Sequence, residues 1–565
     1  MVGVYAIVDK AQAAISALLT EGFVPEVEIV QGGIVMCDWN KENIVNPLTR
    51  MDYPDPDVIR VEDTYYMVST TMHFMPGCEI LRSYDLKQWE HISYVYDYLD
   101  GTPGQRLEGE AQIYGKGMWA ASLRFHKGTY YVIFVANDTH TTYLYRAEDI
   151  RGPWRKSTIQ GFYHDCSLLF DDDDRIYLAY GNTEIHIQEL KADLSGPKED
   201  GLHRIAVVDV QRPCLGYEGT HFYKIGGKYY LFFIHSLKER WRRVEACFVA
   251  DSIEGEFTGK DVLNDDRGYC DQGVAQGGIV DTPDGRWYGI LFQDSGAVGR
   301  IPVLVPVHFE GDYPVFGIDG KVPVEFETPK ERPGYSYTPL AGSDDFRQNA
   351  DNCGLAEDAK RLYGCFGLKS CWQFNHEPDL SLTCQDTEKG TWRVTTDKLC
   401  DNVTQAKNTL TQRMTYPGCS AQVTVDGSLL KCGDYAGICA LQGCYGMIGL
   451  TKEADGYYLV MRGKAPEDVS LQAKGGTDYH GQEYGRVFLG TRANVRLKID
   501  IDFTNMKDEA HFYYHTGEGW TLLGNTHKLA FKLDHFTGCR FGLFVYATKE
   551  TGGSGVFGDF RYEPA

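Results

Sequence analysis

The sequence IRVEDTYYMV at residues 59–68 joins an apolar run to an aromatic run through a short acidic turn. Four later segments repeat this pattern: RFHKGTYYVIF (124–134), LLFDDDDRIYLAY (168–180), HFYKIGGKYYLFFI (221–234) and GGIVDTPDGRWYGILF (277–292). Because short turns connect runs rich in Tyr, Phe, Ile and Val, each copy predicts a β-hairpin. The copies recur about every 45 to 65 residues, which suits one four-stranded propeller blade per copy.

A second pattern follows four of the hairpins, in which a further strand leads into an acidic loop. Its copies are ILRSYDLKQWEHI (80–92), LYRAEDIRGPWRKS (144–157), IQELKADLSGP (187–197) and CFVADSIEGEFTG (247–259). Two patterns in register favour a five-bladed propeller, and a large β-sandwich is the alternative.

The rest of the chain predicts two further parts. Residues 1–40 carry a helical period in apolar side chains between positions 6 and 19, which indicates an N-terminal helical extension followed by a linker. The propeller is expected over residues 41–330, ending near the Pro-rich segment ETPKERPGYSYTPL (327–340). Residues 331–565 alternate apolar and polar side chains again, as in NVRLKIDIDF (494–503), and predict a two-sheet β-sandwich.

Composition and charge restrict the function. The chain has 565 residues, 43% of them hydrophobic, and a formal charge of −23 from 79 acidic and 56 basic residues. An acidic protein of this kind is a poor ligand for nucleic acid or for an anionic membrane, so we expect neither as a partner. No run approaches the roughly 20 apolar residues of a membrane span, and the N-terminus does not have the pattern of a signal peptide. The 16 cysteines form no CxxC pair, which favours free thiols and a cytoplasmic location.

Three acidic residues have equivalent places at the start of a hairpin's first strand. Asp55 lies in YPDPDVI between two prolines, Asp165 in YHDCSLLF and Glu218 in GYEGTHFY. Propeller symmetry would bring them around one axis, where neighbouring carboxylates raise one another's pKa values and so separate an acid from a base. The alternative is that each side chain only caps a turn.

The motifs around these residues resemble those of glycoside hydrolase family 43, a family of inverting exo-glycosidases built on a five-bladed propeller. The matching motifs are NPLTRMDYPDPDVIRVEDTYYMVST (46–70), MPGCEILRSYDLKQW (75–89), GKGMWAASLRFHKGTYYVIF (115–134), HDCSLLFDDDDRIYLAYGN (164–182) and GYEGTHFYKIGGKYYLFF (216–233). Residues 343–423 also resemble the start of the concanavalin-like sandwich of the family's β-xylosidase and α-L-arabinofuranosidase branch.

The resemblance implies roles for single residues. Asp55 would be the general base that activates water, Glu218 the general acid, and Asp165 the carboxylate that orients the acid and keeps its pKa high. Inversion requires acid and base carboxyls roughly 6.5 to 9.5 Å apart, which non-adjacent blades can supply.

The resemblance also implies a sugar pocket. Arg300 would donate hydrogen bonds to sugar hydroxyls, Trp119 would cover an apolar sugar face, and His221 would also bind substrate. His73 and Phe74 are weaker candidates for the rim of the pocket. A sandwich loop such as residues 547–555 would lean over the propeller mouth and close the pocket.

The chain departs from the family where relatives have a channel histidine that can hold a cation, since Gln276 takes that position. We therefore expect no required cofactor and no metal ligands, with a calcium ion on the Gln276 carbonyl oxygen as the alternative. The loop after the acid also departs from the family, because it reads Glu-Gly-Thr-His instead of having a proline before the histidine.

Together these observations predict an exo-acting, inverting glycosidase that releases terminal β-D-xylose, α-L-arabinofuranose or both from small hemicellulose oligosaccharides. Two other classes stay open: a retaining fructosidase-like propeller hydrolase and a non-catalytic carbohydrate-binding propeller. Association of the chain into a homo-oligomer also stays open.

Overall fold

The structure is a computed structural model that describes residues 26–30, 33–37, 45–211, 213–350, 365–467, 479–515 and 517–565. The chain forms two compact units: Met1–Asn46 with Val324–Glu327, and Pro47–Pro323 with Thr328–Ala565. In the first unit, strands β1 (Glu26–Val30) and β2 (Gly33–Cys37) pair as an antiparallel hairpin. This hairpin occupies the predicted linker, while the predicted helical pattern at positions 6–19 lies outside the described residues.

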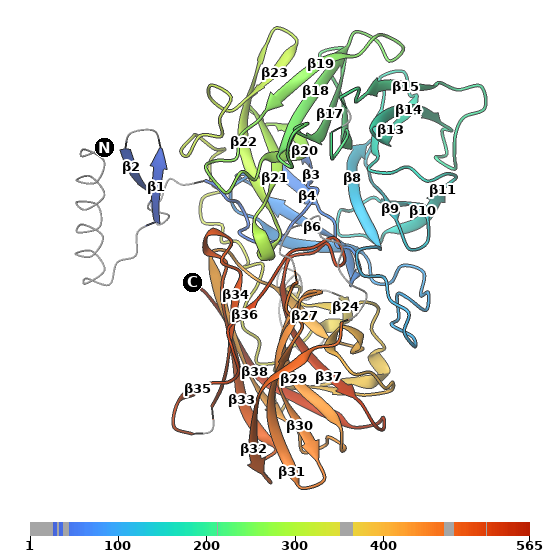
Figure 1. Cartoon of the computed structure of the whole chain (residues 1–565). Coiled ribbons are helices and arrows are strands. Elements are labelled where there is room, and N and C mark those ends of the chain that lie inside the picture. Colours follow the sequence, from blue (N-terminus) through green and yellow to red (C-terminus); the bar gives the residue numbers. More distant parts are fainter. Residues whose placement is uncertain are drawn as a thin grey trace, which may run out of the picture. The chain divides into compact units, whose positions relative to one another are not determined.

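The second unit begins with five four-stranded antiparallel sheets, which confirm the predicted five-bladed propeller (Figure 1). Blade 1 contains β3 (Asp57–Val61), β4 (Thr64–Val68), β6 (Gly77–Ser83) and β7 (Glu90–Tyr96), and blade 2 contains β8 (Met118–His126), β9 (Thr129–Ala136), β10 (Thr141–Ala147) and β11 (Arg155–Ile159). Blade 3 contains β12 (Ser167–Phe170), β13 (Ile176–Asn182), β14 (Glu184–Leu190) and β15 (His203–Val208). Blade 4 contains β16 (Glu218–Ile225), β17 (Lys228–Ser236), β18 (Arg243–Ala250) and β19 (Thr258–Leu263). Blade 5 contains β20 (Val274–Asp281), β21 (Trp287–Asp294), β22 (Arg300–Glu310) and β23 (Tyr313–Phe316).

Each of the five repeated hairpins supplies the first two strands of one blade, and the second repeated pattern supplies the third strand of blades 1 to 4. Tyr and Phe side chains on these strands are buried, as Tyr177, Phe232 and Phe292 are, in clusters that combine residues of neighbouring blades. Aromatic and β-branched side chains pack well on a pleated surface, which explains why this repeat specifies strands.

The C-terminal part is a sandwich of two antiparallel sheets, as predicted. One sheet has the order β32 (Gln482–Gly490), β31 (Gly456–Gly463), β30 (Gly446–Glu453), β29 (Asp434–Leu441), β37 (Arg540–Ala547), β27 (Leu410–Arg413), β24 (Gln373–Asn375) and β5 (Phe74–Met75). The other has the order β25 (Thr383–Asp386), β26 (Thr391–Thr395), β38 (Ser554–Pro564), β28 (Gly418–Asp426), β33 (Asn494–Asp502), β34 (Glu509–His515) and β35 (Trp520–Leu522), with β36 (His527–Lys528) beside β34. The described residues contain no helix longer than a short 3-10 turn.

Propeller and sandwich are joined by shared structure as well as by the chain. Strand β5, which belongs to the propeller by sequence, pairs with β24 and so extends a sandwich sheet. The hydrophobic core of the sandwich also includes Ala297, Val298 and Ile301 from blade 5. The residues between β21 and β22 are therefore packed by the sandwich, which places Arg300 at this junction.

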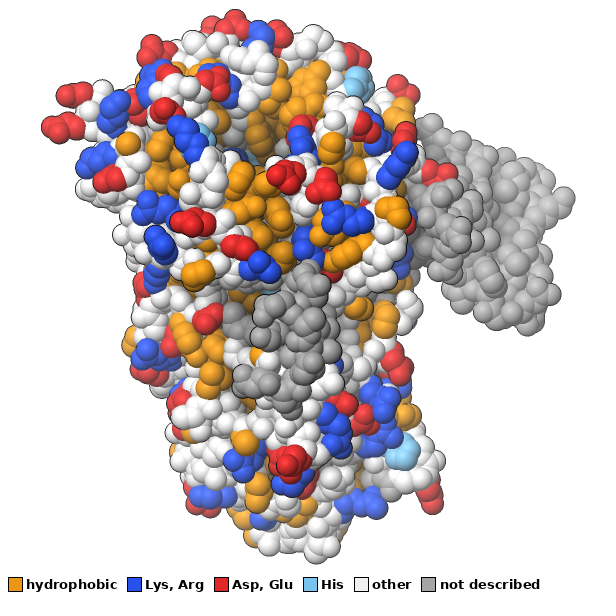
Figure 2. All heavy atoms as spheres, turned by 180° about the vertical axis from the view of Figure 1, so that it is seen from behind, with side chains coloured by type: hydrophobic (Ala, Val, Ile, Leu, Met, Phe, Trp, Pro, Cys, Tyr) orange, Lys and Arg blue, Asp and Glu red, His pale blue; other side chains and the backbone are white. Residues whose placement is uncertain are grey.

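Charged side chains are mixed on the surface shown in Figure 2, where Lys and Arg lie among Asp and Glu without forming one basic area. In the described residues no helix is both long and apolar enough to cross a membrane. The 13 cysteines whose side chains the structure describes are free thiols.

Candidate active site

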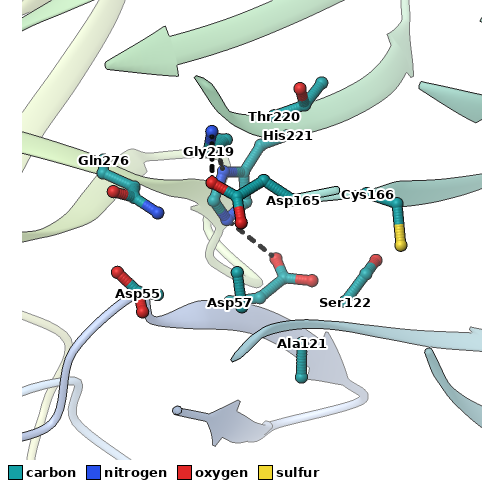
Figure 3. Close-up of a pocket in the computed structure, with 11 residues that line it drawn as sticks. Asp55, Asp57, Ala121, Ser122, Asp165, Cys166, Gly219, Thr220, His221 and Gln276 are labelled. Carbon is teal, nitrogen blue, oxygen red and sulfur yellow. Dashed lines mark hydrogen bonds and ion pairs between the residues drawn. The ribbon is translucent and has the colours of Figure 1, made fainter. Parts of the chain in front are cut away.

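The inner strands of the propeller surround a small cavity at the predicted site (Figure 3). Its volume is about 10 Å³, which is room for about one water molecule. The lining residues are Asp55, Asp57, Ala120, Ala121, Ser122, Asp165, Cys166, Gly219, Thr220, His221 and Gln276. Two of the three predicted carboxylates, Asp55 and Asp165, therefore line the cavity. The third, Glu218, directly precedes Gly219 of the cavity wall.

Backbone irregularities at the starts of inner strands aim these side chains inward. The strand register shifts between Trp119 and Ser122 in β8, between Glu218 and His221 in β16, and between Ala275 and Gly277 in β20. Such bulges bend a strand and redirect its side chains. Asp55 and Asp165 have φ angles of 52° and 47°, a left-handed conformation that Asp tolerates better than bulkier residues do.

Asp55 is buried, and each of its two carboxylate oxygens accepts one hydrogen bond. One carboxylate oxygen, Oδ2, accepts a hydrogen bond of 2.6 Å from the Thr70 hydroxyl, which itself accepts one from the Ala120 backbone N–H. The other oxygen, Oδ1, accepts from Nη1 of Arg300 at 2.8 Å. These contacts fix the carboxylate at the cavity, as a base that must direct a water molecule requires.

Arg300 connects the cavity to the sandwich. Its guanidinium lies 4.3 Å from the centre of the Phe536 ring, and Nη2 donates a 3.5 Å hydrogen bond to the Phe536 carbonyl oxygen. The side chain is only 2% exposed, and its Nε has no hydrogen-bond partner among the described residues. A buried donor of this kind can bind a hydroxyl group of a ligand.

Asp165 is the most deeply buried of the three carboxylates. Its Oδ2 accepts a 3.0 Å hydrogen bond from the backbone N–H of Gly219, the residue that follows Glu218. Burial raises the pKa of Asp165 to about 6; the nearby His164 opposes this rise, whereas the carboxylates of Glu218 and Asp55 add to it. Asp165 therefore lies close enough to both of the other predicted carboxylates for their charges to act on it.

Glu218 is the most accessible of the three, with 18% of its side chain exposed against 9% for Asp55 and 6% for Asp165. Its Oε2 accepts a hydrogen bond from the Asn182 amide and lies 3.6 Å from Nε2 of His164. An acid must reach the leaving group of the substrate, and this greater exposure suits that task.

His164 lies between Asp165 and Glu218, with Nε2 at 3.6 Å from an oxygen of each. The Asp165 carboxylate raises the pKa of His164 to about 9, although burial opposes the shift. These three side chains are also the one group in the described residues with a geometry that could hold a metal ion, since their ligand atoms lie within 4.8 Å of one another.

The remaining predicted residues have different locations. Trp119 lies at the site, where its ring centre is 5.6 Å from that of Phe536 and 6.1 Å from that of His164. His221 lines the cavity wall, with Nδ1 at 3.1 Å from the Gly219 carbonyl oxygen and Nε2 at 3.6 Å from Oδ1 of Asp57.

His73 and Phe74 do not form a pocket rim in the structure. Phe74 belongs to β5, and the guanidinium of Arg540 lies 3.5 Å from its ring centre. His73 is buried against the imidazole rings of His376 and His535 from the sandwich. Both side chains therefore build the contact between propeller and sandwich, which explains why hydrophobic and aromatic residues occur in this loop.

The sandwich reaches the site through a different loop from the one predicted. Residues 547–555 hydrogen-bond within the sandwich, where the Gly553 and Thr551 carbonyl oxygens accept from Thr396 and Lys431. The segment after β36 approaches instead, and it contributes Phe536. Sequence reasoning did not identify Phe536, His164 or Asn182, and only His164, next to Asp165, carried a local signal.

Comparisons with known proteins agree with the presence of these two domains. The family model described as glycosyl hydrolases family 43 matches residues 44–313, and the model of the β-xylosidase C-terminal concanavalin A-like domain matches residues 367–563. A β-xylosidase from Formosa agariphila is 24% identical over 90% of this chain and 88% of its own length.

Two solved structures share both domains. A protein from Bacteroides eggerthii described as a bifunctional GH43-CE is 38% identical, with a TM-score of 0.83 over 93% of this chain and 64% of that chain. This chain thus spans less than two thirds of that bifunctional protein. An engineered family-43 glycoside hydrolase, described as having both endo-xylanase and exo-arabinofuranosidase activity, is 26% identical, with a TM-score of 0.80 over 93% of this chain and all of that one.

Proposed function

The chain belongs to glycosyl hydrolase family 43 and is a glycoside hydrolase, and from this premise we propose that it is an exo-acting, inverting enzyme. It would release terminal β-D-xylose, α-L-arabinofuranose or both from small xylo-oligosaccharides or arabinoxylan fragments. The observation that carries the proposal is that Asp55 and Asp165 line one cavity beside Arg300, while the charge of Glu218 from blade 4 acts on Asp165.

In this proposal Asp55 and Glu218 each carry out one of the two proton transfers of an inverting hydrolysis. Asp55 takes a proton from a water molecule while the oxygen of that water bonds to the anomeric carbon. Glu218 gives its own proton to the leaving oxygen as the glycosidic bond breaks. The hydrogen bonds from Thr70 and Arg300 support the role of Asp55, because they fix the orientation of its carboxylate. The greater exposure of Glu218 supports its contact with the leaving group.

Exo action is supported by the aromatic side chains beside the site. Trp119 and Phe536 bring two rings together from different domains, and Phe536 also covers the Arg300 guanidinium. A wall of this kind suits the apolar face of one terminal sugar better than the passage of a long chain. Xylopyranose and arabinofuranose offer similar hydroxyl arrangements to such a pocket, which is why dual activity is included.

Three further proposals complete this function. Hydrolysis requires no cofactor, because two carboxylates carry both proton transfers, and Gln276 stands where relatives can hold a cation. The partner is a small oligosaccharide, with no nucleic acid or membrane. The protein acts in the cytoplasm, which fractionation of cells that produce it would test.

The catalytic roles are tested with two conservative variants and two substrates. Glu218→Gln should lower kcat/KM on xylobiose by roughly 10² to 10⁴-fold, and much less on an aryl xyloside whose leaving group needs no proton. Asp55→Asn should lower both by a similar factor, because both reactions need an activated water. Both variants should still bind xylose. If the wild-type protein binds both xylobiose and an arabinofuranosyl xylo-oligosaccharide without turnover of either, or if both variants stay active, the proposal is wrong.

A further inference from the structure

The segment that carries Asp55 is held by the sandwich, and this arrangement points to a further residue of the site. The inference rests on the proposed role of Asp55 as the base. Between Asp52 and Asp55 the chain forms no regular strand, so its position depends on individual hydrogen bonds. Most of these bonds lead to Arg300 or to residues of the sandwich.

Asp52 is a buried carboxylate that joins three segments. Its Oδ1 accepts a 2.8 Å hydrogen bond from the backbone N–H of Arg300, and its Oδ2 accepts a 2.7 Å bond from the backbone N–H of Gly538. Gly538 lies two residues after Phe536, in the sandwich segment that reaches the site. Asp52 therefore ties the base segment to both the backbone of Arg300 and the loop that carries Phe536.

This carboxylate is enclosed so closely that glycine is needed beside it. A Cβ atom at Gly299 would lie 2.3 Å from Oδ1 of Asp52, and one at Gly538 would lie 2.6 Å from its Cβ. Burial raises the pKa of Asp52, and the positive charges of Arg300 and Arg413 offset part of that effect. Burying a carboxylate costs free energy, and its hydrogen bonds and nearby positive charges offset that cost. A buried carboxylate is therefore expected where its contacts hold a particular geometry.

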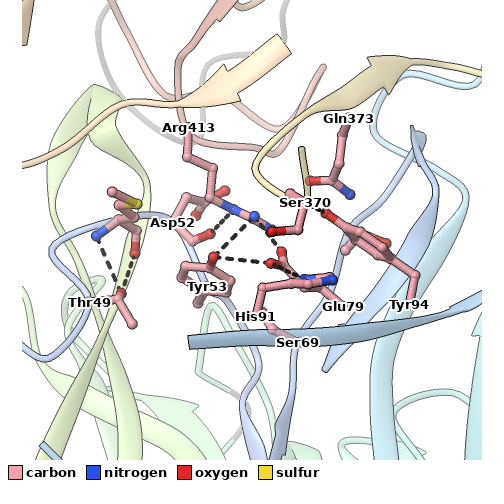
Figure 4. Close-up of polar contacts among 12 residues, drawn as sticks. Thr49, Asp52, Tyr53, Ser69, Glu79, His91, Tyr94, Ser370, Gln373 and Arg413 are labelled. Carbon is pink, nitrogen blue, oxygen red and sulfur yellow. Dashed lines mark hydrogen bonds and ion pairs between the residues drawn. The ribbon is translucent and has the colours of Figure 1, made fainter. Parts of the chain in front are cut away.

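Arg413 of β27 also holds this segment (Figure 4). Its Nε donates a 2.9 Å hydrogen bond to the Asp52 carbonyl oxygen, and Nη1 donates to the Tyr53 hydroxyl at 3.2 Å and to the Glu79 carboxylate. The guanidinium also lies 4.0 Å from the centre of the Tyr53 ring. The planar fork of Arg413 thus fixes the backbone of Asp52 and the side chain of Tyr53.

The remaining contacts carry this constraint to the base. The Tyr53 N–H donates to the Arg300 carbonyl oxygen at 3.0 Å, and the Pro54 carbonyl oxygen accepts from the Ser69 hydroxyl at 2.6 Å. Arg300 then donates to Asp55 itself. Displacement of Asp52 would therefore move Arg300 and the base together.

We propose that Asp52 is a positioning residue for Asp55 and Arg300, and that Arg413 and Gly538 of the sandwich hold it in place. The sandwich thereby takes part in placing the catalytic base, in addition to supplying Phe536. Because the effect acts through Asp55, its loss should resemble partial loss of the base and differ from a general loss of folded protein.

The variant Asp52→Asn tests this proposal with little change of volume. An Asn side chain offers one acceptor oxygen, so its NH₂ group faces either the Arg300 or the Gly538 N–H, and one hydrogen bond is lost. We expect kcat/KM on xylobiose to fall by roughly 10 to 100-fold, since a displacement of about 1 Å can cost about that factor. Arg413→Lys, which keeps the charge but not the fork, should lower it in the same way.

Azide distinguishes misplacement of the base from loss of structure. Azide attacks the anomeric carbon without giving up a proton, so it needs no base; its nitrogen bonds to carbon while the leaving oxygen takes the Glu218 proton. Azide should therefore accelerate both variants and yield a glycosyl azide of inverted configuration. The matched control is Tyr94→Phe, which removes a 2.9 Å hydrogen bond between propeller and sandwich, to the Ser370 carbonyl oxygen. This bond is not one of those described above for residues 52–55.

The outcomes separate this inference from the proposed function. Azide rescue of Asp52→Asn and Arg413→Lys, with none for Tyr94→Phe at a similar melting temperature, supports the inference. If Asp55→Asn is rescued but both positioning variants behave like Tyr94→Phe, the inference is wrong and the proposed function stands. If Asp55→Asn stays active without azide, the proposed function fails, and the positioning role fails with it.

Discussion

Truncation of Phe536 to alanine should open the active site from the sandwich side. The Phe536 ring lies 4.3 Å from the Arg300 guanidinium and 5.6 Å from the Trp119 ring, so this one side chain contacts two predicted substrate-binding residues. The carbonyl oxygen that accepts from Arg300 belongs to the backbone and remains in the variant. The effect of Phe536→Ala is therefore that of the ring alone.

The size of the effect follows from these two contacts. A cation–π interaction at a largely desolvated site contributes about 1 to 2 kcal/mol. An aromatic pair contributes about 0.5 to 1.5 kcal/mol. Their sum of about 1.5 to 3.5 kcal/mol corresponds to a loss in kcat/KM between about 10-fold and about 400-fold, at about 1.36 kcal/mol per tenfold.

The assay compares initial rates on xylobiose for the wild type, Phe536→Ala and Leu533→Ala. Leu533 lies in the same loop but is 47% exposed, and its truncation should change kcat/KM less than about twofold, as is usual for surface positions. A Phe536→Ala enzyme within threefold of the wild type would refute the argument that the sandwich closes the site.

Three further predictions concern binding, pH and metal dependence. Trp119→Phe keeps an aromatic ring but removes the indole N–H, which has no hydrogen-bond partner in the described structure, so steady-state kinetics on xylobiose should show a higher KM with little change in kcat. Burial lowers the pKa of His535 to about 4, below the unfolded value of about 6.5, so the folded state favours the neutral ring and stability falls as pH drops from 6.5 towards 4. Between pH 7 and pH 5, urea unfolding should therefore show about 2 kcal/mol more loss of unfolding free energy for the wild type than for His535→Gln, and equal losses would contradict this account. Activity in excess EDTA should stay within about twofold of that with added calcium; a larger loss that calcium restores would contradict the proposal that no metal is required.

The propeller could be predicted from the sequence because its determinants are local. A hairpin such as residues 59–68 contains its own turn and alternating side chains, and β3 and β4 form there. The sites of Asp55 and Glu218 were predictable for the same reason, because each stands just before or at the start of a repeated hairpin.

Other parts of the site depend on contacts between distant residues. Asp52 and Gly538 are 486 residues apart, and Arg300 and Phe536 are 236 apart. Phe74 and His73 show the opposite error. Their local sequence predicted the rim of the pocket, but in the structure they form a contact between propeller and sandwich. No local period or motif could distinguish these cases, because the sandwich loop that approaches the site is chosen by tertiary packing.

The central claim is that Asp55 and Glu218 hydrolyse a terminal pentoside with inversion, and stereochemistry tests it most directly. Proton NMR spectra of a mixture of xylobiose and an arabinofuranosyl xylo-oligosaccharide would record the anomeric signals before mutarotation. The account predicts α-xylose, β-arabinose or both as the first product. First appearance of β-xylose or α-arabinose would mean retention and would contradict the roles assigned to both carboxylates.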